Sequence, residues 1–179
     1  MSELLTKDDR LFTIEQPTAE HAEEIIQHSK QIFSSTDQLL TTVEEYTIST
    51  ESEMEWINKT NSNPNSLLLI AKLDKKIVGF LFFISHSKKK ISHSGEFGVN
   101  VRPDFQGLGI GSALIHSLLK WARLNRQIEK VVLQVFATNK KAIDLYIKLG
   151  FIEEGRHKKA IKQLDGTYVD LLQMYFETP

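Results

Sequence analysis

The chain has 179 residues, of which 41% are hydrophobic and 25% are charged, and its formal net charge at pH 7 is −1. Length and composition are typical of one globular domain with a sizeable core, so we expect a single domain over residues 1–179. The sequence contains no cysteine, which excludes a disulfide framework, a thiolate metal site, an iron–sulfur cluster and a cysteine nucleophile.

The charges are unevenly distributed along the chain. Residues 1–60 hold thirteen acidic and four basic residues, whereas residues 102–162 hold twelve basic and five acidic ones. Two differently charged solvated faces would explain this, and so would an anionic ligand held by the second region and a cationic one near the first. The N-terminus is too polar for a signal peptide, and no apolar run approaches the ~20 residues that span a bilayer. We expect a cytoplasmic protein that binds neither membranes nor nucleic acid.

The first third of the chain predicts one strand and two helices. An apolar segment at 11–16 predicts a strand that ends at Pro17, and Thr18 is a suitable N-cap for the helix that follows. Residues 34–52 lack clear periodicity and are interpreted as a loop with short turns. A second, short helix is expected over 53–59.

The rest of the chain predicts strands that are only partly separated by helices. Apolar residues at every second position indicate strands, and apolar residues three and four positions apart indicate helices. Gly150 is suited to the left-handed conformation that often follows the end of a helix. The expected strands are 67–73, 77–85, 91–101, 131–136, 151–154 and 168–176, and the expected helices are 108–126 and 140–149. This order predicts an α/β (α+β) fold with a mixed sheet and helices on both faces.

The most informative segment is a glycine-rich turn between a strand and a helix. From Val99 to Ser112 the sequence reads V-N-V-R-P-D-F-Q-G-L-G-I-G-S, with glycines at alternate positions. Such glycines allow main-chain N–H groups to converge, and the helix N-terminus adds partial positive charge, so the segment predicts a phosphate or pyrophosphate site. A P-loop would need Gly-Lys-Ser/Thr, and a dinucleotide fingerprint would need glycine at 112. A purely structural tight turn remains an alternative.

Two segments resemble signatures of the GNAT superfamily of N-acetyltransferases. Residues 106–111 (Q-G-L-G-I-G) are similar to its coenzyme A-binding pattern Gln/Arg-x-x-Gly-x-Gly/Ala, and residues 139–151 (N-K-K-A-I-D-L-Y-I-K-L-G-F) to N-x-x-A-x-x-x-Y-x-x-x-G-F. The resemblance covers nearly the whole chain in element order. It implies a mostly antiparallel sheet of about seven strands, acetyl-coenzyme A (acetyl-CoA) as co-substrate and no metal.

The resemblance also implies roles for individual residues. Main-chain amides from Gly107 to Ser112 would bind the pyrophosphate, Asn139 would hydrogen-bond the pantetheine arm, Ala142 would let the cofactor pass closely, and Tyr146 would lie near its sulfur. The full set of expected cofactor-binding residues is Val99, Val101, Gln106, Gly107, Leu108, Gly109, Ile110, Gly111, Ser112, Asn139, Ala142 and Tyr146. Gln106 replaces the more frequent arginine, which removes a charge near the pyrophosphate.

Forming an amide from a thioester requires a neutral amine, a polarised carbonyl and a proton for the thiolate. Without cysteine, transfer is most simply direct, in a ternary complex. The main-chain N–H of Val101 is the candidate for polarising the carbonyl, and Tyr146 is the expected acid, although periodicity alone would make it a core residue. Glu96 is the leading base candidate, and a solvated surface acid is an equally good interpretation. Asp170 is its rival, because a carboxylate in an apolar strand needs a partner.

Several features of the sequence stay open. The six histidines have no metal-ligand spacing and are interpreted as solvated. The acceptor is expected to be a primary amine of a small molecule or peptide, flanked by residues 34–52 and 157–168. Glu44, Glu45 and Glu51 could favour a polyamine or could be solvated. A non-catalytic coenzyme A sensor or interaction module of the same fold, another kind of nucleotide-binding domain, and a homodimer remain alternatives.

Overall fold

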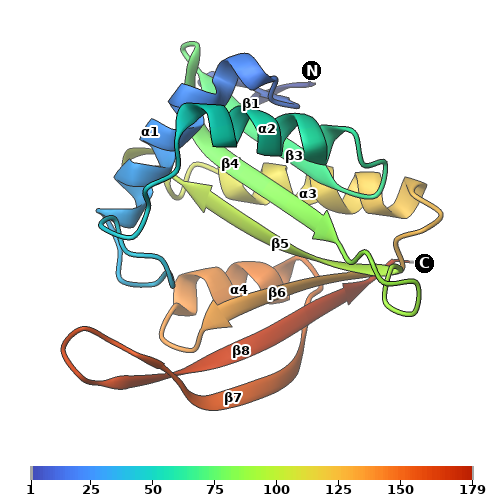
Figure 1. The fold of residues 1–179 in the computed structure, drawn as a ribbon. Helices are drawn as coiled ribbons and strands as arrows, with labels where there is room; N and C mark the ends of the chain where they lie inside the picture. The colour runs from blue at the N-terminus through green and yellow to red at the C-terminus, as the bar shows by residue number, and fades with distance from the viewer. Residues whose placement is uncertain (1, 179) are drawn as a thin grey trace.

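The computed structural model describes residues Ser2–Thr178, which form one sheet with helices on both of its faces (Figure 1). The strands are β1 (Ser2–Leu5), β2 (Leu11–Glu15), β3 (Leu67–Leu73), β4 (Lys76–Ser85), β5 (Ser94–Val101), β6 (Lys130–Phe136), β7 (Ile152–Lys162) and β8 (Tyr168–Glu177). The α-helices are α1 (Ala22–Phe33), α2 (Thr50–Asn61), α3 (Ile110–Leu124) and α4 (Lys140–Lys148), and the 3-10 turns are η1 (Ala19–His21) and η2 (Pro103–Phe105). Among the described residues, no helix has the length and apolar character needed to cross a membrane.

The eight strands are ordered β1-β2-β3-β4-β5-β6-β8-β7. Every neighbouring pair is antiparallel except β5 and β6, which run parallel. The prediction of a mixed, mostly antiparallel sheet with helices on both faces is therefore confirmed, with eight strands against the expected seven or so. The additional strand is β1, which pairs with β2 at the edge of the sheet.

Several element bounds differ from the prediction, for local reasons. The second helix begins at Thr50 instead of residue 53, because the Ser49 hydroxyl accepts a hydrogen bond from the Ser52 N–H (3.2 Å) and caps the helix three residues earlier. The strand expected over 151–154 extends to Lys162 as β7, so residues 157–168, which the sequence analysis expects to flank the acceptor, belong to a long hairpin with β8.

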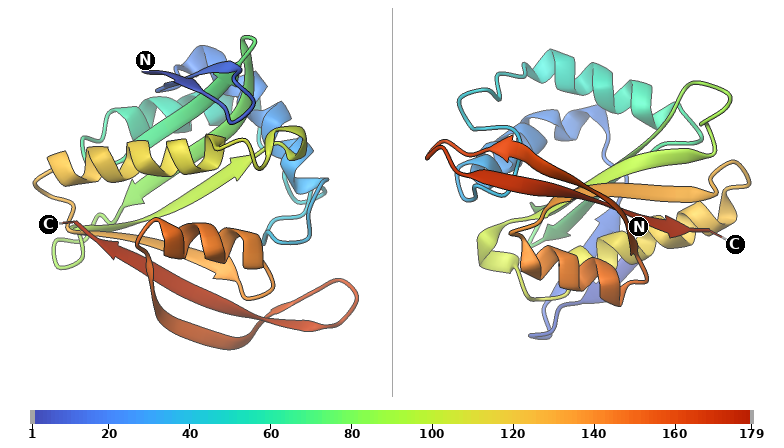
Figure 2. Two further views of the ribbon diagram at one scale, coloured as in Figure 1. Left: turned by 180° about the vertical axis from the view of Figure 1, so that it is seen from behind. Right: turned by 90° about the horizontal axis from the view of Figure 1, so that it is seen from below.

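Figure 2 shows helices on both faces of the sheet, and an apolar core on each face holds them there. Helices α3 and α4 cover one face, where Leu114 and Leu118 of α3 are fully buried. Helices α1 and α2 cover the other face, where Ile25 and Ile57 pack against β3 and β4. Because β3 contributes residues to both cores, it is apolar at nearly every position.

Strands β5 and β6 are paired at one end only. Their parallel pairs are Ser94 with Lys130, Gly95 with Val131 and Glu96 with Val132. Beyond these pairs β5 continues to Val101 and β6 to Phe136, and Figure 1 shows the two strands diverging, with α4 beside the opening. We call this divergence, formed by residues 97–101 of β5 and 133–136 of β6, the strand fork.

Candidate functional site

The main chain of β5 has unused hydrogen-bonding groups at the strand fork. The Arg102 N–H donates to the Val78 carbonyl (2.9 Å) at the end of the β4–β5 ladder. Alternate pairs of an antiparallel ladder exchange hydrogen bonds, so the even-numbered residues of β5 bond to β4, and Val99 and Val101 direct their main-chain groups toward β6. Since β6 pairs only with the first three residues of β5, the N–H groups of Val99 and Val101 have no partner within residues 2–178.

The glycine turn, residues 106–111, follows directly and opens outward. Gly107 (φ 82°) and Gly109 (φ 94°) are in the left-handed region that side chains rarely adopt. Helix α3 begins at Ile110, so the N–H groups of its first turn have no acceptor inside the helix, and that turn contains no acidic residue. A Cβ at Gly107 would meet no atom within 4 Å, so the turn is not packed against the sheet there. This geometry fits a pyrophosphate, and it does not favour the alternative of a purely structural turn.

Two lysines lie beside the glycine turn. The Gln106 side chain donates from Nε2 to the Val101 carbonyl (3.1 Å) and accepts at Oε1 from Lys141 Nζ (3.2 Å). The main-chain N–H of Lys7, in the β1–β2 connection, donates to the Leu108 carbonyl (3.0 Å). Gln106 therefore links the end of β5 to the start of α4, and Lys141 supplies a positive charge next to the residue that replaced arginine.

Helix α4 brings the second motif to the same opening. Asn139 is the N-cap of α4, and its Oδ1 accepts a hydrogen bond from the Ala142 N–H (3.2 Å). The side-chain amide nitrogen of Asn139 takes no part in this cap. Ala142 is half-buried against the larger core. Gly150 (φ 92°) ends the helix as the sequence predicted.

Tyr146 lies in an aromatic cluster at the point where β5 and β6 separate. Its side chain is 8% exposed and packs edge-on against Phe97 of β5 (6.1 Å between ring centroids) and against Phe151 (5.9 Å). Burial raises the pKa of Tyr146 to about 12, so the phenol is neutral near pH 7. Tyr146 is thus both a core residue and a neighbour of the strand fork.

The two candidate bases have different surroundings. The Asp170 carboxylate accepts from the Lys159 N–H (2.8 Å) and lies 3.6 Å from the Arg156 guanidinium, so it holds the bulged part of the β7–β8 hairpin. Glu96 is exposed on β5, on the sheet face that also carries Gly98 and Asn100. The Asp170 carboxylate therefore has structural partners in Lys159 and Arg156. Glu96 is the better candidate for proton transfer.

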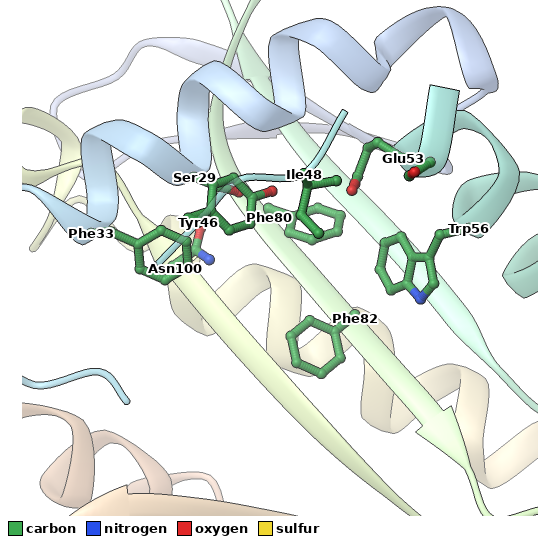
Figure 3. Close-up of a pocket in the computed structure, with 10 residues that line it drawn as sticks. Ser29, Phe33, Tyr46, Ile48, Glu53, Trp56, Phe80, Phe82 and Asn100 are labelled. Atoms are coloured by element: carbon green, nitrogen blue, oxygen red, sulfur yellow. The ribbon is translucent and has the colours of Figure 1, made fainter. Parts of the chain in front are cut away.

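A cavity of about 350 Å³ lies on the α1–α2 face of β4 and β5 (Figure 3). Its ten lining residues come from α1, α2, β4, β5 and the loop 34–49, and we call it the aromatic cavity: Ser29, Phe33, Tyr46, Ile48, Ser52, Glu53, Trp56, Phe80, Phe82 and Asn100. Tyr46, Ile48 and Ser52 belong to the segment 34–52 that the sequence analysis expects to flank the acceptor, and the other seven lining residues were not assigned to a site. Glu53 and Trp56 are three apart on a helix, and Phe80 and Phe82 alternate on a strand, but no sequence spacing links the two pairs.

Glu53 is the one acidic residue of this cavity. The residue is 6% exposed, and no ion pair or hydrogen bond to its carboxylate is found in residues 2–178. Burial raises the pKa of Glu53 above its ordinary value of 4.5. The acids that we considered from the sequence, Glu44, Glu45 and Glu51, are exposed instead.

One histidine corrects the expectation that all six are solvated. His28 of α1 is 3% exposed, and its Nε2 lies 2.6 Å from Oδ1 of Asn100, which lines the aromatic cavity. Because a carboxamide oxygen only accepts, Nε2 carries the hydrogen, and the buried Nδ1 has no partner within the described residues. Burial lowers the pKa of His28, which keeps the ring neutral.

A family model and the curated relatives of this chain all describe acetyltransferases. Residues 23–151 match the model of the acetyltransferase (GNAT) family. An L-amino acid N-acetyltransferase of Escherichia coli is 30% identical over 123 residues, 69% of this chain and 75% of that protein. A spermidine N(1)-acetyltransferase of Vibrio cholerae is 30% identical over 115 residues, 64% of this chain and 65% of that protein.

Solved structures share the fold over nearly the whole chain. A GNAT-family acetyltransferase of Streptococcus pneumoniae superposes with a TM-score of 0.90 at 23% identity, covering 94% of this chain and 99% of that one. The Salmonella typhimurium protein yncA, solved with its cofactor acetyl-CoA, has a TM-score of 0.82 at 20% identity and covers 94% of each chain.

Proposed function

This chain belongs to the acetyltransferase (GNAT) family, and from that premise we propose that it moves the acetyl group of acetyl-CoA onto a primary amine. The acceptor is an amine of a small molecule or peptide, which attacks directly in a ternary complex. The observation that carries the proposal is a run of main chain from Val99 through the glycine turn to the first turn of α3, along which the N–H groups of Val99, of Val101 and of the first turn of α3 lack partners within residues 2–178. Such a run suits a ligand with amide groups along its length and a pyrophosphate at its end.

The residues at the strand fork fit this co-substrate. N–H groups from Gly107 to Ser112, with Lys141 nearby, would hold the pyrophosphate, and the main chain of Val99 and Val101 would hold the pantetheine arm. The free amide nitrogen of Asn139 can reach the same arm. Acetyl-CoA, when bound, supplies the thioester whose carbonyl carbon the amine attacks.

The remaining chemistry is the movement of protons. An alkylammonium has a pKa of about 10.4, and forming the amide removes two protons from its nitrogen. Glu96 would accept one through a water and pass it to solvent, and Tyr146 would give its phenolic proton to the sulfur as the C–N bond forms and the C–S bond breaks. The other ammonium proton then restores Tyr146, so one proton is released per turnover.

Val99 is a better candidate than Val101 for polarising the carbonyl. The sulfur and the carbonyl oxygen share one carbon atom, so their proton donors must lie close together. Tyr146 packs on Phe97, and Val101 is four residues farther along the strand, about 13 Å at ~3.3 Å per residue. Val99 is half as far and also has an unpartnered N–H.

The comparisons support a small amine as acceptor without choosing one. The two relatives described above are named for L-amino acids and for spermidine, which differ in charge and length. Which amine this chain accepts must therefore be inferred from the residues of its own acceptor-binding region.

Thermal stabilisation tests the proposal first, with acetyl-CoA, coenzyme A, ATP and NAD compared side by side. A ligand at 100 times its dissociation constant adds about 2.7 kcal/mol to the free energy of unfolding, so acetyl-CoA and coenzyme A should raise the melting temperature while ATP and NAD should not. No shift at millimolar acetyl-CoA would overturn the proposal. Acetyl-CoA binding without thiol release from any amine in a broad panel would instead favour the non-catalytic sensor.

A further inference from the structure

Glu53 is 6% exposed as a residue, and its carboxylate, which opens onto the aromatic cavity, has no ion-pair or hydrogen-bond partner among residues 2–178. Desolvation penalises its charged form, and neither a cation nor a hydrogen-bond donor among residues 2–178 offsets that cost. The group nevertheless lines a cavity large enough for a small ligand. An incoming cation would supply the missing partner.

The walls around Glu53 suit a cation as well. Trp56 lies edge-on to Phe80 (6.2 Å between ring centroids) and to Phe82 (6.4 Å), and Tyr46 contributes a third wall from the loop 34–49. Figure 3 shows Glu53 and Trp56 extending from α2 toward the rings of β4. Aromatic faces attract ammonium groups, most strongly when water is excluded, and they also bury methylene groups.

The cavity is poorly suited to an acceptor that carries a carboxylate. Its ten lining residues include one acid and no lysine, arginine or histidine. A free α-carboxylate placed there would be desolvated next to Glu53, and like charges at close range are unfavourable.

The polar groups of the cavity lie on two sides of an apolar middle. Figure 3 shows Asn100, on β5, and Glu53, on α2, on either side of the ring of Phe80. On the cavity face of β5, Gly98 lies between Asn100 and Glu96. The Phe82 ring packs directly on Gly98, since a Cβ there would lie 2.6 Å from the ring. An extended molecule can therefore have one end at Glu53 and the other at β5, where the acetyl group would be transferred.

We infer that the aromatic cavity selects an acceptor with two positively charged nitrogens separated by a short apolar chain, and that Glu53 binds the nitrogen that is not acetylated. This inference rests on the proposed function and adds its substrate class. Glu53 is a specificity-determining residue here, since it pairs with the distal ammonium and takes no part in proton transfer.

Three amines of matched length test the inference: 1,5-diaminopentane, hexylamine and 6-aminohexanoate. They share an amine and five methylenes and end in an ammonium, a methyl or a carboxylate. In thiol-release assays we expect kcat/KM to fall in that order, with the diamine at least about tenfold above hexylamine, in line with a desolvated ion pair and cation–π contact. The Glu53→Gln variant should bring the diamine-to-hexylamine ratio close to one. The matched control is Glu55→Gln, which neutralises an exposed carboxylate on the same helix and should keep the wild-type ratio.

A binding readout separates this inference from the proposed function. The diamine should raise the melting temperature of the wild type and of Glu55→Gln, and should leave Glu53→Gln unshifted while acetyl-CoA still stabilises all three proteins. Equal kcat/KM for the three amines, preference for 6-aminohexanoate, or an unchanged ratio in Glu53→Gln would overturn the inference and leave the acetyltransferase proposal standing. Diamine stabilisation that depends on Glu53, without thiol release from any amine, would support the cavity assignment and count against catalysis.

Discussion

The two sides of β5 offer different kinds of chemistry. At the strand fork, the available groups are main-chain N–H groups of Val99, Val101 and the glycine turn, supplemented by Lys141. On the sheet face covered by α1 and α2, the aromatic cavity consists of side chains, with Glu53 as its charged member. Main-chain groups are the same whatever the side chain, whereas a cavity of side chains changes with each substitution. Changes to the main chain of the fork are therefore expected to affect co-substrate binding, and side-chain substitutions in the cavity to affect the choice of acceptor.

The largest expected effect tests the chemistry at the fork. Tyr146→Phe removes one hydroxyl and keeps the ring packing on Phe97 and Phe151. General acid catalysis typically contributes about 10²–10⁴-fold, so we expect kcat to fall at least about 100-fold while the dissociation constant of acetyl-CoA stays within a few-fold. Steady-state kinetics and calorimetry measure the two quantities. Unchanged turnover would make Tyr146 a core residue only.

A second substitution perturbs the main chain of the fork. Gly109→Ala puts a side chain at φ 94°, which costs roughly 1–2 kcal/mol of stability, and it should weaken acetyl-CoA binding about tenfold or more by shifting the N–H groups of the turn. Gly155→Ala is the control, because Gly155 is outside the positive-φ glycines and a Cβ there meets no atom within 4 Å. Equal acetyl-CoA affinity in both variants would show that the turn does not bind the co-substrate.

A third prediction concerns the cavity alone, without any ligand. Because the folded-state pKa of Glu53 lies above 4.5, the folded protein retains a proton that the unfolded chain releases, and stability falls as pH rises from 4.5 through the raised pKa. Glu53→Gln should remove this loss, so the variant gains stability relative to wild type between pH 4 and neutral pH. Urea unfolding at both pH values measures it. If the difference in unfolding free energy between Glu53→Gln and the wild type does not change with pH, Glu53 is not desolvated in the folded protein.

The smallest effect is expected from the buried histidine behind the cavity. The pKa of His28 is lowered from 6.5, chiefly by burial and slightly by Arg102, while Asn100, Ile77 and Glu24 oppose the shift. The unfolded chain therefore binds a proton that the folded chain excludes, and stability contributed by neutral His28 is lost as pH falls below 6.5. His28→Gln should flatten the stability profile between pH 7 and pH 5. An unchanged slope would assign acid sensitivity to other groups.

The two motifs that meet at the fork could be predicted from the sequence, because each is a local pattern. Alternating glycines and the spacing from Asn139 to Tyr146 are local patterns, and the structure places both at one opening, together with Val99 and Val101. Their roles toward a co-substrate remain proposals. What sequence reasoning could not supply was the pairing limit of β5 and β6, because it depends on contacts between distant strands.

Only the segment 34–52 was expected to flank the acceptor, and the cavity itself could not be predicted, because its residues meet only through tertiary packing. Glu53 looked like one acid among many in an acidic N-terminal region, and nothing local shows that it is buried while Glu55 is exposed. The same holds for His28, whose partner Asn100 is 72 residues away. Strand β1 was missed because four residues give too short a pattern to identify.

The hydrogen bond from Lys7 to Leu108 has a consequence for how the chain folds. It fixes the glycine turn through a contact between residues 7 and 108, so this loop can be closed only after the intervening strands and helices have ordered enough to bring its ends together. Contacts between residues so far apart in the sequence form late in folding, because closing the long loop between them costs conformational entropy. We therefore expect the turn to be among the last parts to gain protection from hydrogen exchange during refolding, well after the hairpin of β3 and β4.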